Sequence, residues 1–259
     1  MTGHRCCKLL AGFAIACGPF ALSQDKPARL TYDVASVRPS DPAAPQVGID
    51  PLPNGVGYNA VGVTVRDMLS VMYRLPRRQI VGGPDWVHNE NFDVLVRADH
   101  RYSIDDLHTM FQNMLVERFN LKLHIETKAG PVYALTIAKS GLKMTPVDEG
   151  KDRNRPILTD TENEFTGSRV PINYLCFWLG MKLENDHRPV IDKTGLTGHY
   201  DFRLSFRRQL PPDTSSSPEL ENLPSIFDAV KDQLGLQLVP QRGPVEMLVI
   251  DHIEKPSEN

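Results

Sequence analysis

Three segments of this chain occur a second time in the same order, and this internal repeat constrains the fold more than any other feature. Residues 58–69 (YNAVGVTVRDML) resemble residues 165–176 (FTGSRVPINYLC) at an offset of 107 (165 − 58). The other repeated segments are FDV at 92–94, matched by YDF at 200–202, and GPV at 130–132, matched by GPV at 243–245. A repeat of this length predicts two copies of one supersecondary unit.

Within each copy, the apolar spacing predicts the element order β-α-β-β-α-β-β. In the first copy, residues 65–72 and 104–118 carry apolar side chains at helical spacing. Residues 121–125 and 132–138 alternate as strands, and we expect Gly130-Pro131 to turn the chain between them. Short helices that do not alternate regularly with strands are typical of the α+β class. We therefore predict two tandem modules, each a small sheet covered by two helices.

The N-terminus predicts export. Residues 1–23 combine a basic start with a short apolar run, LLAGFAIACGPFAL, and a small-x-small site at Ala21-Leu22-Ser23. This pattern is typical of a signal peptide, because about 20 apolar residues are needed to span a bilayer and this run is shorter. Lipidation at Cys17 is the alternative. We expect no transmembrane segment and a periplasmic or extracellular location.

Composition sets the remaining boundaries. Residues 24–139 would form the first module with an N-terminal strand and a proline-rich loop, and residues 164–259 would form the second. The stretch between them, 140–163, is charged and poor in apolar side chains, which predicts a linker.

The net charge of −3 argues against nucleic acid as a partner, since phosphate binding needs a basic face. After removal of residues 1–23, Cys176 is the one remaining cysteine, and we expect it to be buried.

The chain resembles a family of secreted, soil-associated bacterial proteins built on a domain of unknown function. The segments that carry this resemblance are YDVASVRPS at 32–40, QIVGGPDW at 79–86, FDV at 92–94, LxxRF at 115–119, PVYAL at 131–135, DKTGLTGxYDF at 192–202 and DHIEKPS at 251–257. The resemblance covers nearly all of the chain after residue 23 and implies no particular activity. In element order alone, each copy is also similar to the short N-terminal domains of secretins and TonB-dependent receptors, which bind other proteins.

One cluster of side chains could carry acid–base chemistry. Asp192, His199 and Asp201 lie around a glycine-rich turn of the second copy, and general acid–base catalysis needs titratable groups within hydrogen-bond reach. The alternative is turn chemistry, in which Asp192 accepts backbone N–H groups.

The histidines suggest a metal hypothesis, but their spacing does not support it. His108 shares a helix face with Gln112, and two further pairs, His124-x-Glu126 and His199-x-Asp201, each lie on one side of a strand. None of these pairs has a third partner at a diagnostic spacing, and HExxH is absent from the sequence. We therefore predict neither a metal nor a cofactor.

The leading functional hypothesis is binding without catalysis. Asp85 and Trp86 lie in a predicted turn, and Trp178 lies on a predicted helix; tryptophan is frequent in interface hot spots. We expect these residues to contact an envelope protein or peptide through a sheet edge or the groove between the modules. The alternatives are a hydrolytic enzyme that uses the Asp/His cluster, and a small-molecule carrier with a pocket between the modules.

Overall fold

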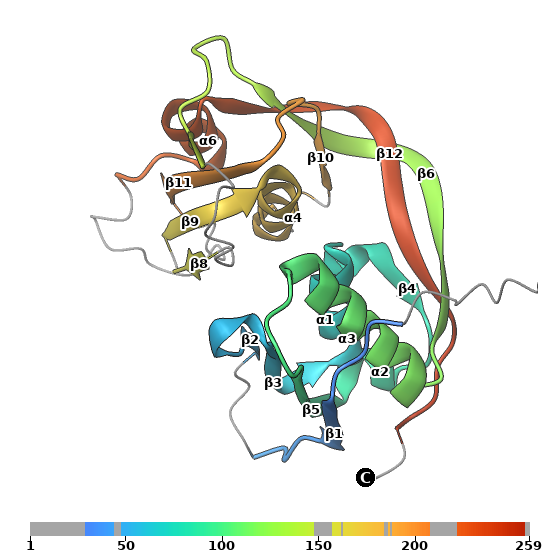
Figure 1. Cartoon of the computed structure of the whole chain (residues 1–259). Coiled ribbons are helices and arrows are strands. Elements are labelled where there is room, and N and C mark those ends of the chain that lie inside the picture. Colours follow the sequence, from blue (N-terminus) through green and yellow to red (C-terminus); the bar gives the residue numbers. More distant parts are fainter. Residues whose placement is uncertain are drawn as a thin grey trace, which may run out of the picture.

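The computed structural model describes residues 29–43, 48–147, 157–161, 163–183, 186, 188–207 and 222–256. It shows two lobes bridged by a long two-stranded ribbon (Figure 1). The α+β class is confirmed, because each lobe combines a small antiparallel sheet with helices. The predicted signal peptide, residues 1–23, and the alternative lipidation site at Cys17 lie outside the described residues. Within those residues, no helix has the length and apolar character needed to cross a membrane.

The first lobe is built on a four-stranded antiparallel sheet with the order β1-β5-β3-β2. Its elements are β1 (Val34–Pro39), β2 (Gly48–Pro51), η1 (Pro53–Gly55), β3 (Gly57–Thr64), α1 (Val65–Tyr73), η2 (Arg77–Gln79), α2 (Trp86–Asn89), β5 (Asn91–Arg97) and α3 (Ile104–Arg118). Helix α1 begins with a capping box, in which the Thr64 side chain accepts the Asp67 N–H and the Asp67 carboxylate accepts the Thr64 N–H. The capping residues therefore fix where β3 ends and the helix begins.

The second lobe repeats this plan, with the sheet order β7-β11-β9-β8. Its elements are β7 (Thr145–Val147), β8 (Ile157–Asp160), β9 (Glu164–Pro171), α4 (Ile172–Lys182), β11 (His199–Ser205) and α6 (Ile226–Leu234). Strands β7 and β8 occupy the places that β1 and β2 hold in the first lobe, although both fall within the stretch predicted as a linker. Parts of that stretch therefore form the two outer edges of the sheet.

A ribbon of two long antiparallel strands joins the lobes (Figure 1). Strand β6 (Lys122–Ile137) pairs with β12 (Leu236–His252) along nearly its whole length. Two short strands extend the ribbon in parallel, β4 (Ile80–Gly82) beside β12 and β10 (Val190–Asp192) beside β6. The predicted turn at Gly130-Pro131 is wrong, because the chain runs straight through these residues as one strand.

The ribbon exchanges strands between the two copies. Leu248 and Ile250, from the end of the second copy, are buried in the core of the first lobe. Tyr133 and Leu135, from the end of the first copy, are buried in the core of the second lobe. The predicted modules 24–139 and 164–259 therefore do not enclose separate cores, because each core is completed by the last strand of the other copy.

The repeated Gly-Pro-Val segment marks the centre of this exchange. Gly130 and Gly243 lie directly opposite each other in the ribbon. A Cβ atom on Gly130 would lie 2.9 Å from a methyl group of Val245, and one on Gly243 would lie 2.9 Å from a methyl group of Val132. Each glycine is thus needed to make room for the valine of the other copy.

Candidate functional site

The three residues predicted as an acid–base cluster belong to two different sheets. Asp192 ends β10 in the ribbon sheet, whereas His199 and Asp201 lie on β11 in the sheet of the second lobe. Asp192 Oδ1 accepts hydrogen bonds from both the N–H and the hydroxyl of Thr194, each at 2.8 Å. This is the turn chemistry that we considered as the alternative.

Asp201 has a structural partner of its own. Strand β9 bulges beside β11 at Arg169, which has a φ of 60°, and Asp201 Oδ1 accepts the Arg169 N–H at 2.8 Å. The first lobe repeats this arrangement, because Asp93 Oδ1 accepts the N–H of Gly62 at 3.1 Å in the corresponding bulge. A carboxylate that closes the same bulge in both lobes has a role in the fold that needs no catalytic explanation.

The two tryptophans predicted as contact residues differ in exposure. Trp86 is half-buried, with its ring centroid 6.3 Å from that of Phe119 and with the Lys255 ammonium 5.9 Å above it; its neighbour Asp85 is exposed. Trp178 is only 8% exposed and stacks on Phe165 at 3.7 Å. Trp178 therefore belongs to the core of the second lobe, and Trp86 is partly covered by the C-terminal segment.

Sequence spacing missed a third residue beside His124. The ribbon brings Asp251 to this histidine, and Nδ1 of His124 lies 2.9 Å from both carboxylate oxygens, while Nε2 lies 3.4 Å from Glu126. Hydrogen bonds to Asp251 and Glu126 raise the pKa of His124. Since both ring nitrogens face carboxylates, the cluster favours a protonated imidazole over a metal ligand. Among the residues described, no group of three acidic, histidine or cysteine side chains is arranged to hold a metal ion.

Cys176 is buried and free, as expected. Desolvation raises the pKa of its thiol, and the negative charge of Asp192 raises it further. The thiol is therefore protonated at neutral pH and is a poor nucleophile.

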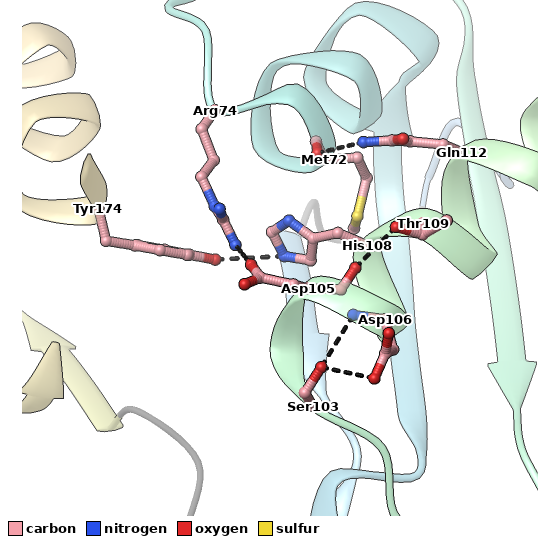
Figure 2. A network of polar contacts seen from close by, with 9 residues as sticks. All are labelled: Met72, Arg74, Ser103, Asp105, Asp106, His108, Thr109, Gln112 and Tyr174. Carbon is pink, nitrogen blue, oxygen red and sulfur yellow. Dashed lines mark hydrogen bonds and ion pairs between the residues drawn. The ribbon is translucent and has the colours of Figure 1, made fainter. Parts of the chain in front are cut away.

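The lobes meet at a contact that we call the seam, formed by Arg74 directly after α1, His108 of α3 and Tyr174 of α4. Figure 2 shows Tyr174 reaching across from the second lobe, where its hydroxyl lies 3.2 Å from Nε2 of His108. The Arg74 guanidinium lies 4.8 Å from the centre of the Tyr174 ring and forms an ion pair with Asp105. His108 is only 3% exposed, so the seam is a packed contact that excludes most water.

A second set of contacts extends the seam along α4. Nη1 of Arg78 donates a hydrogen bond to the Gly180 carbonyl at 3.2 Å. A Cβ atom on Gly180 would lie 3.2 Å from the ring of Pro76, so a side chain here would press on the first lobe. The last turns of α4 are thereby fixed against η2 and the residue before it.

Beside these contacts lies a hollow of about 160 Å³, which we call the cleft. The first lobe supplies most of its wall, and Met181 of α4 supplies the part that belongs to the second lobe. The residues that line it are Gly48, Ile49, Val63, Asp67, Ser70, Val71, Arg77 and Met181. Residues from β2, β3, α1, η2 and α4 are needed to form this cleft, and no local spacing in the sequence indicates it.

Two polar side chains of the cleft wall, Ser70 and Asp67, are engaged in hydrogen bonds within the protein. The hydroxyl group of Ser70 is 1% exposed and donates to the Leu75 carbonyl at 2.7 Å. The Asp67 carboxylate is occupied by the start of α1 and by Arg77. Apolar walls with one guanidinium group at the side can hold a ligand, and among the described residues that line the cleft no base is paired with a nucleophile.

Comparison with known proteins places this fold in a family. The family model described as "Protein of unknown function (DUF3738)" matches residues 66–253. The chain belongs to this family. No curated protein and no solved structure matches the chain.

The DUF3738 match begins inside α1 and ends just after β12. It therefore includes the whole ribbon, the three seam residues and the cleft residues from Asp67 onward. The prediction of an uncharacterised domain family is confirmed. Strands β1, β2 and β3 all precede the matched range, although β2 and β3 contribute to the wall of the cleft.

Proposed function

We propose that this chain is a non-catalytic binding module of the cell envelope whose cleft holds one side chain of a protein or peptide partner. The observation that carries the proposal is the composition of the cleft wall, which joins α1 and β2 of one lobe to Met181 of the other. A site at a junction of two lobes is a frequent position for ligands. An envelope partner agrees with the export that the N-terminal sequence predicts.

The cleft is a better candidate for the binding site than a sheet edge. Peptides add to edges that are long and have free N–H groups, whereas short strands and prolines block such pairing. Among the outer strands described, β1 and β2 end in Pro39 and Pro51, and β7 contains Pro146. Strands β4 and β10 have three residues each, and β8 has four. These edges offer little room for an added strand.

The size of the cleft favours a single side chain over a free small molecule. Pockets for drug-sized ligands typically measure about 300–1,000 Å³. The cleft, at about 160 Å³, is smaller, but its walls of Ile49, Val63, Val71 and Met181 suit one apolar side chain. The carrier hypothesis is therefore less well supported than the capture of a peptide segment.

The enzyme hypothesis has less support from the geometry. Asp201 closes a β-bulge that Asp93 closes in the other lobe, and Asp192 stabilises a turn. A substrate screen against envelope and soil polymers, with His199→Ala as the control, tests this hypothesis directly. Turnover that is lost in the variant would support an enzyme.

The binding proposal can be tested with peptides selected from a random phage-displayed library on the chain without residues 1–23. Val71→Phe fills the cleft, and Val116→Phe places the same bulk at an exposed position of α3. We expect calorimetry to show binding by the wild type and by Val116→Phe, and binding at least about tenfold weaker by Val71→Phe, because an excluded apolar side chain loses about 1.5–3 kcal/mol.

Two outcomes would contradict the proposal. Selected peptides that bind Val71→Phe as tightly as the wild type would place the site outside the cleft. Binding that is lost instead in Trp86→Ala would move the contact to the turn at Asp85 and Trp86.

A further inference from the structure

We propose that the partner group held in the cleft carries a carboxylate beside its apolar part, and that Arg77 binds this carboxylate. The inference rests on the proposed function and adds the chemical class of the ligand. It is carried by the position and the hydrogen-bonding state of one guanidinium group in the cleft wall.

Arg77 is held in place but is still accessible. It begins η2, and its Nε donates to the Asp67 carboxylate, which fixes the plane of the guanidinium group. The side chain of Arg77 nevertheless remains 43% exposed. Within the described residues, the two terminal nitrogens of Arg77 have no hydrogen-bond partner. A guanidinium group has five N–H donors, so most of its capacity is unused.

Asp67 does not offset this excess of donors. One of its oxygens accepts from Arg77, and the other accepts the Thr64 N–H at the start of α1 at 3.2 Å. The positive end of the α1 dipole also stabilises the negative charge of Asp67. The cleft therefore offers hydrogen-bond donors and few free acceptors, which favours an anionic ligand.

The apolar walls of the cleft favour an apolar group in the part of the ligand next to the carboxylate. Ile49, Val71 and Met181 line the same hollow as Arg77. A planar carboxylate matches the fork of a guanidinium group, and charge-assisted bonds gain strength next to apolar walls. The matching chemistry is an apolar side chain with a carboxylate next to it. A C-terminal apolar residue supplies this pair, and so does an apolar residue followed by Asp or Glu.

Three synthetic peptides separate these sources. Acetyl-Gly-Gly-Leu with a free C-terminus carries the main-chain carboxylate, acetyl-Gly-Leu-Asp-amide carries a side-chain carboxylate, and acetyl-Gly-Gly-Leu-amide carries none. Their affinities can be followed by NMR on protein labelled with ¹³C-methyl methionine, with the Met181 signal assigned by Met181→Leu. We expect all three peptides to shift the Met181 signal and at least one carboxylate peptide to bind about tenfold more tightly than the amide.

Variants assign this preference to Arg77. Arg77→Gln should abolish the tenfold preference, and Arg77→Lys should keep part of it, because lysine retains the charge without the fork. Arg203→Gln is the matched control, since Arg203 is an exposed arginine that also pairs with an acid, Glu164, but lies in the second lobe. Thermal melting of each variant shows whether it is folded.

The outcomes separate this inference from the function on which it rests. An amide that shifts Met181 and binds as tightly as both carboxylate peptides overturns the role of Arg77 and leaves the cleft as a binding site. A preference for the carboxylate peptides that persists in folded Arg77→Gln also overturns the proposed role of Arg77. A Met181 signal that none of the peptides shifts contradicts both proposals.

Discussion

At the scale of single residues, the two lobes share a carboxylate that closes a β-bulge. Asp93 accepts the Gly62 N–H and also bonds Ser40 and Arg38, while Asp201 accepts the Arg169 N–H. A bulge leaves an unpaired N–H, and a buried donor without a partner costs about 1–3 kcal/mol. These aspartates therefore let each sheet change register without losing a hydrogen bond.

We predict that Asp93→Ala and Asp201→Ala each lower the free energy of unfolding by about 1–3 kcal/mol, because each leaves a bulge N–H unsatisfied. Urea unfolding followed by circular dichroism would measure this loss. Asp50→Ala, at an exposed position of β2, is the control and should change stability by less than about 0.5 kcal/mol. A control that is as destabilising as the bulge variants would contradict the assigned role.

Asp93 also makes the stability of the fold depend on pH. Burial alone would raise the pKa of Asp93, but its hydrogen bonds to Ser40 and Gly62 and the charge of Arg38 outweigh burial and lower it. A lowered folded-state pKa stabilises the fold above the ordinary pKa of Asp, and this contribution is lost as the pH falls through the folded-state value. The stability difference between wild type and Asp93→Ala should therefore shrink on acidification below about pH 4.

At the scale of elements, the repeat predicted most of the helices and strands but not how the last strands pair. The alternation at 121–125 and 132–138 is the same whether these residues form a hairpin or one continuous strand, because period two fixes only the faces of a strand. Gly-Pro is typical of a turn, yet here the glycine makes room for a valine from the other copy. The choice depends on a partner about 113 residues away, which no local window contains.

The centre of the ribbon can be tested with a double-mutant cycle. Gly130→Ala should lower the free energy of unfolding by about 1–3 kcal/mol, because its new methyl group meets Val245. In Val245→Ala the obstructing methyl groups are gone, so the same Gly130 substitution should cost less by at least about 0.5 kcal/mol. Chemical unfolding of the wild type, the two single variants and the double variant measures this coupling free energy. Strictly additive effects would contradict the packing described.

At the scale of the whole molecule, the seam and the cleft bring together residues that the sequence keeps apart. His108 was considered as a metal ligand with Gln112, but the amide of Gln112 donates to the Met72 carbonyl, and His108 faces Tyr174 of the other lobe. The sequence indicated Trp178 of α4 as a contact residue, whereas Tyr174 of the same helix makes the contact at the seam, together with residues of α3 and the end of α1. Such a site follows from tertiary packing, which motif spacing does not encode.

The exchange of strands predicts how the chain behaves when it is cut. A protease site inserted between Val147 and Ile157 would divide it into two fragments, each carrying one long strand of the ribbon. We expect the cut protein to elute as one particle of unchanged size under native conditions and to separate only in denaturant. The uncut insertion variant is the control. Fragments that separate in native buffer would contradict the shared cores.

The packing of two glycines against two valines at the centre of the ribbon makes the two halves of the chain depend on each other. A single copy of the unit lacks the strand that closes its core, because that strand comes from the other copy. We therefore expect one copy alone to fold only when a second molecule supplies this strand. A side chain larger than hydrogen at position 130 would need a smaller residue in place of Val245, and one at position 243 would need a smaller residue in place of Val132. We therefore expect substitutions at these four positions to occur in compensating pairs.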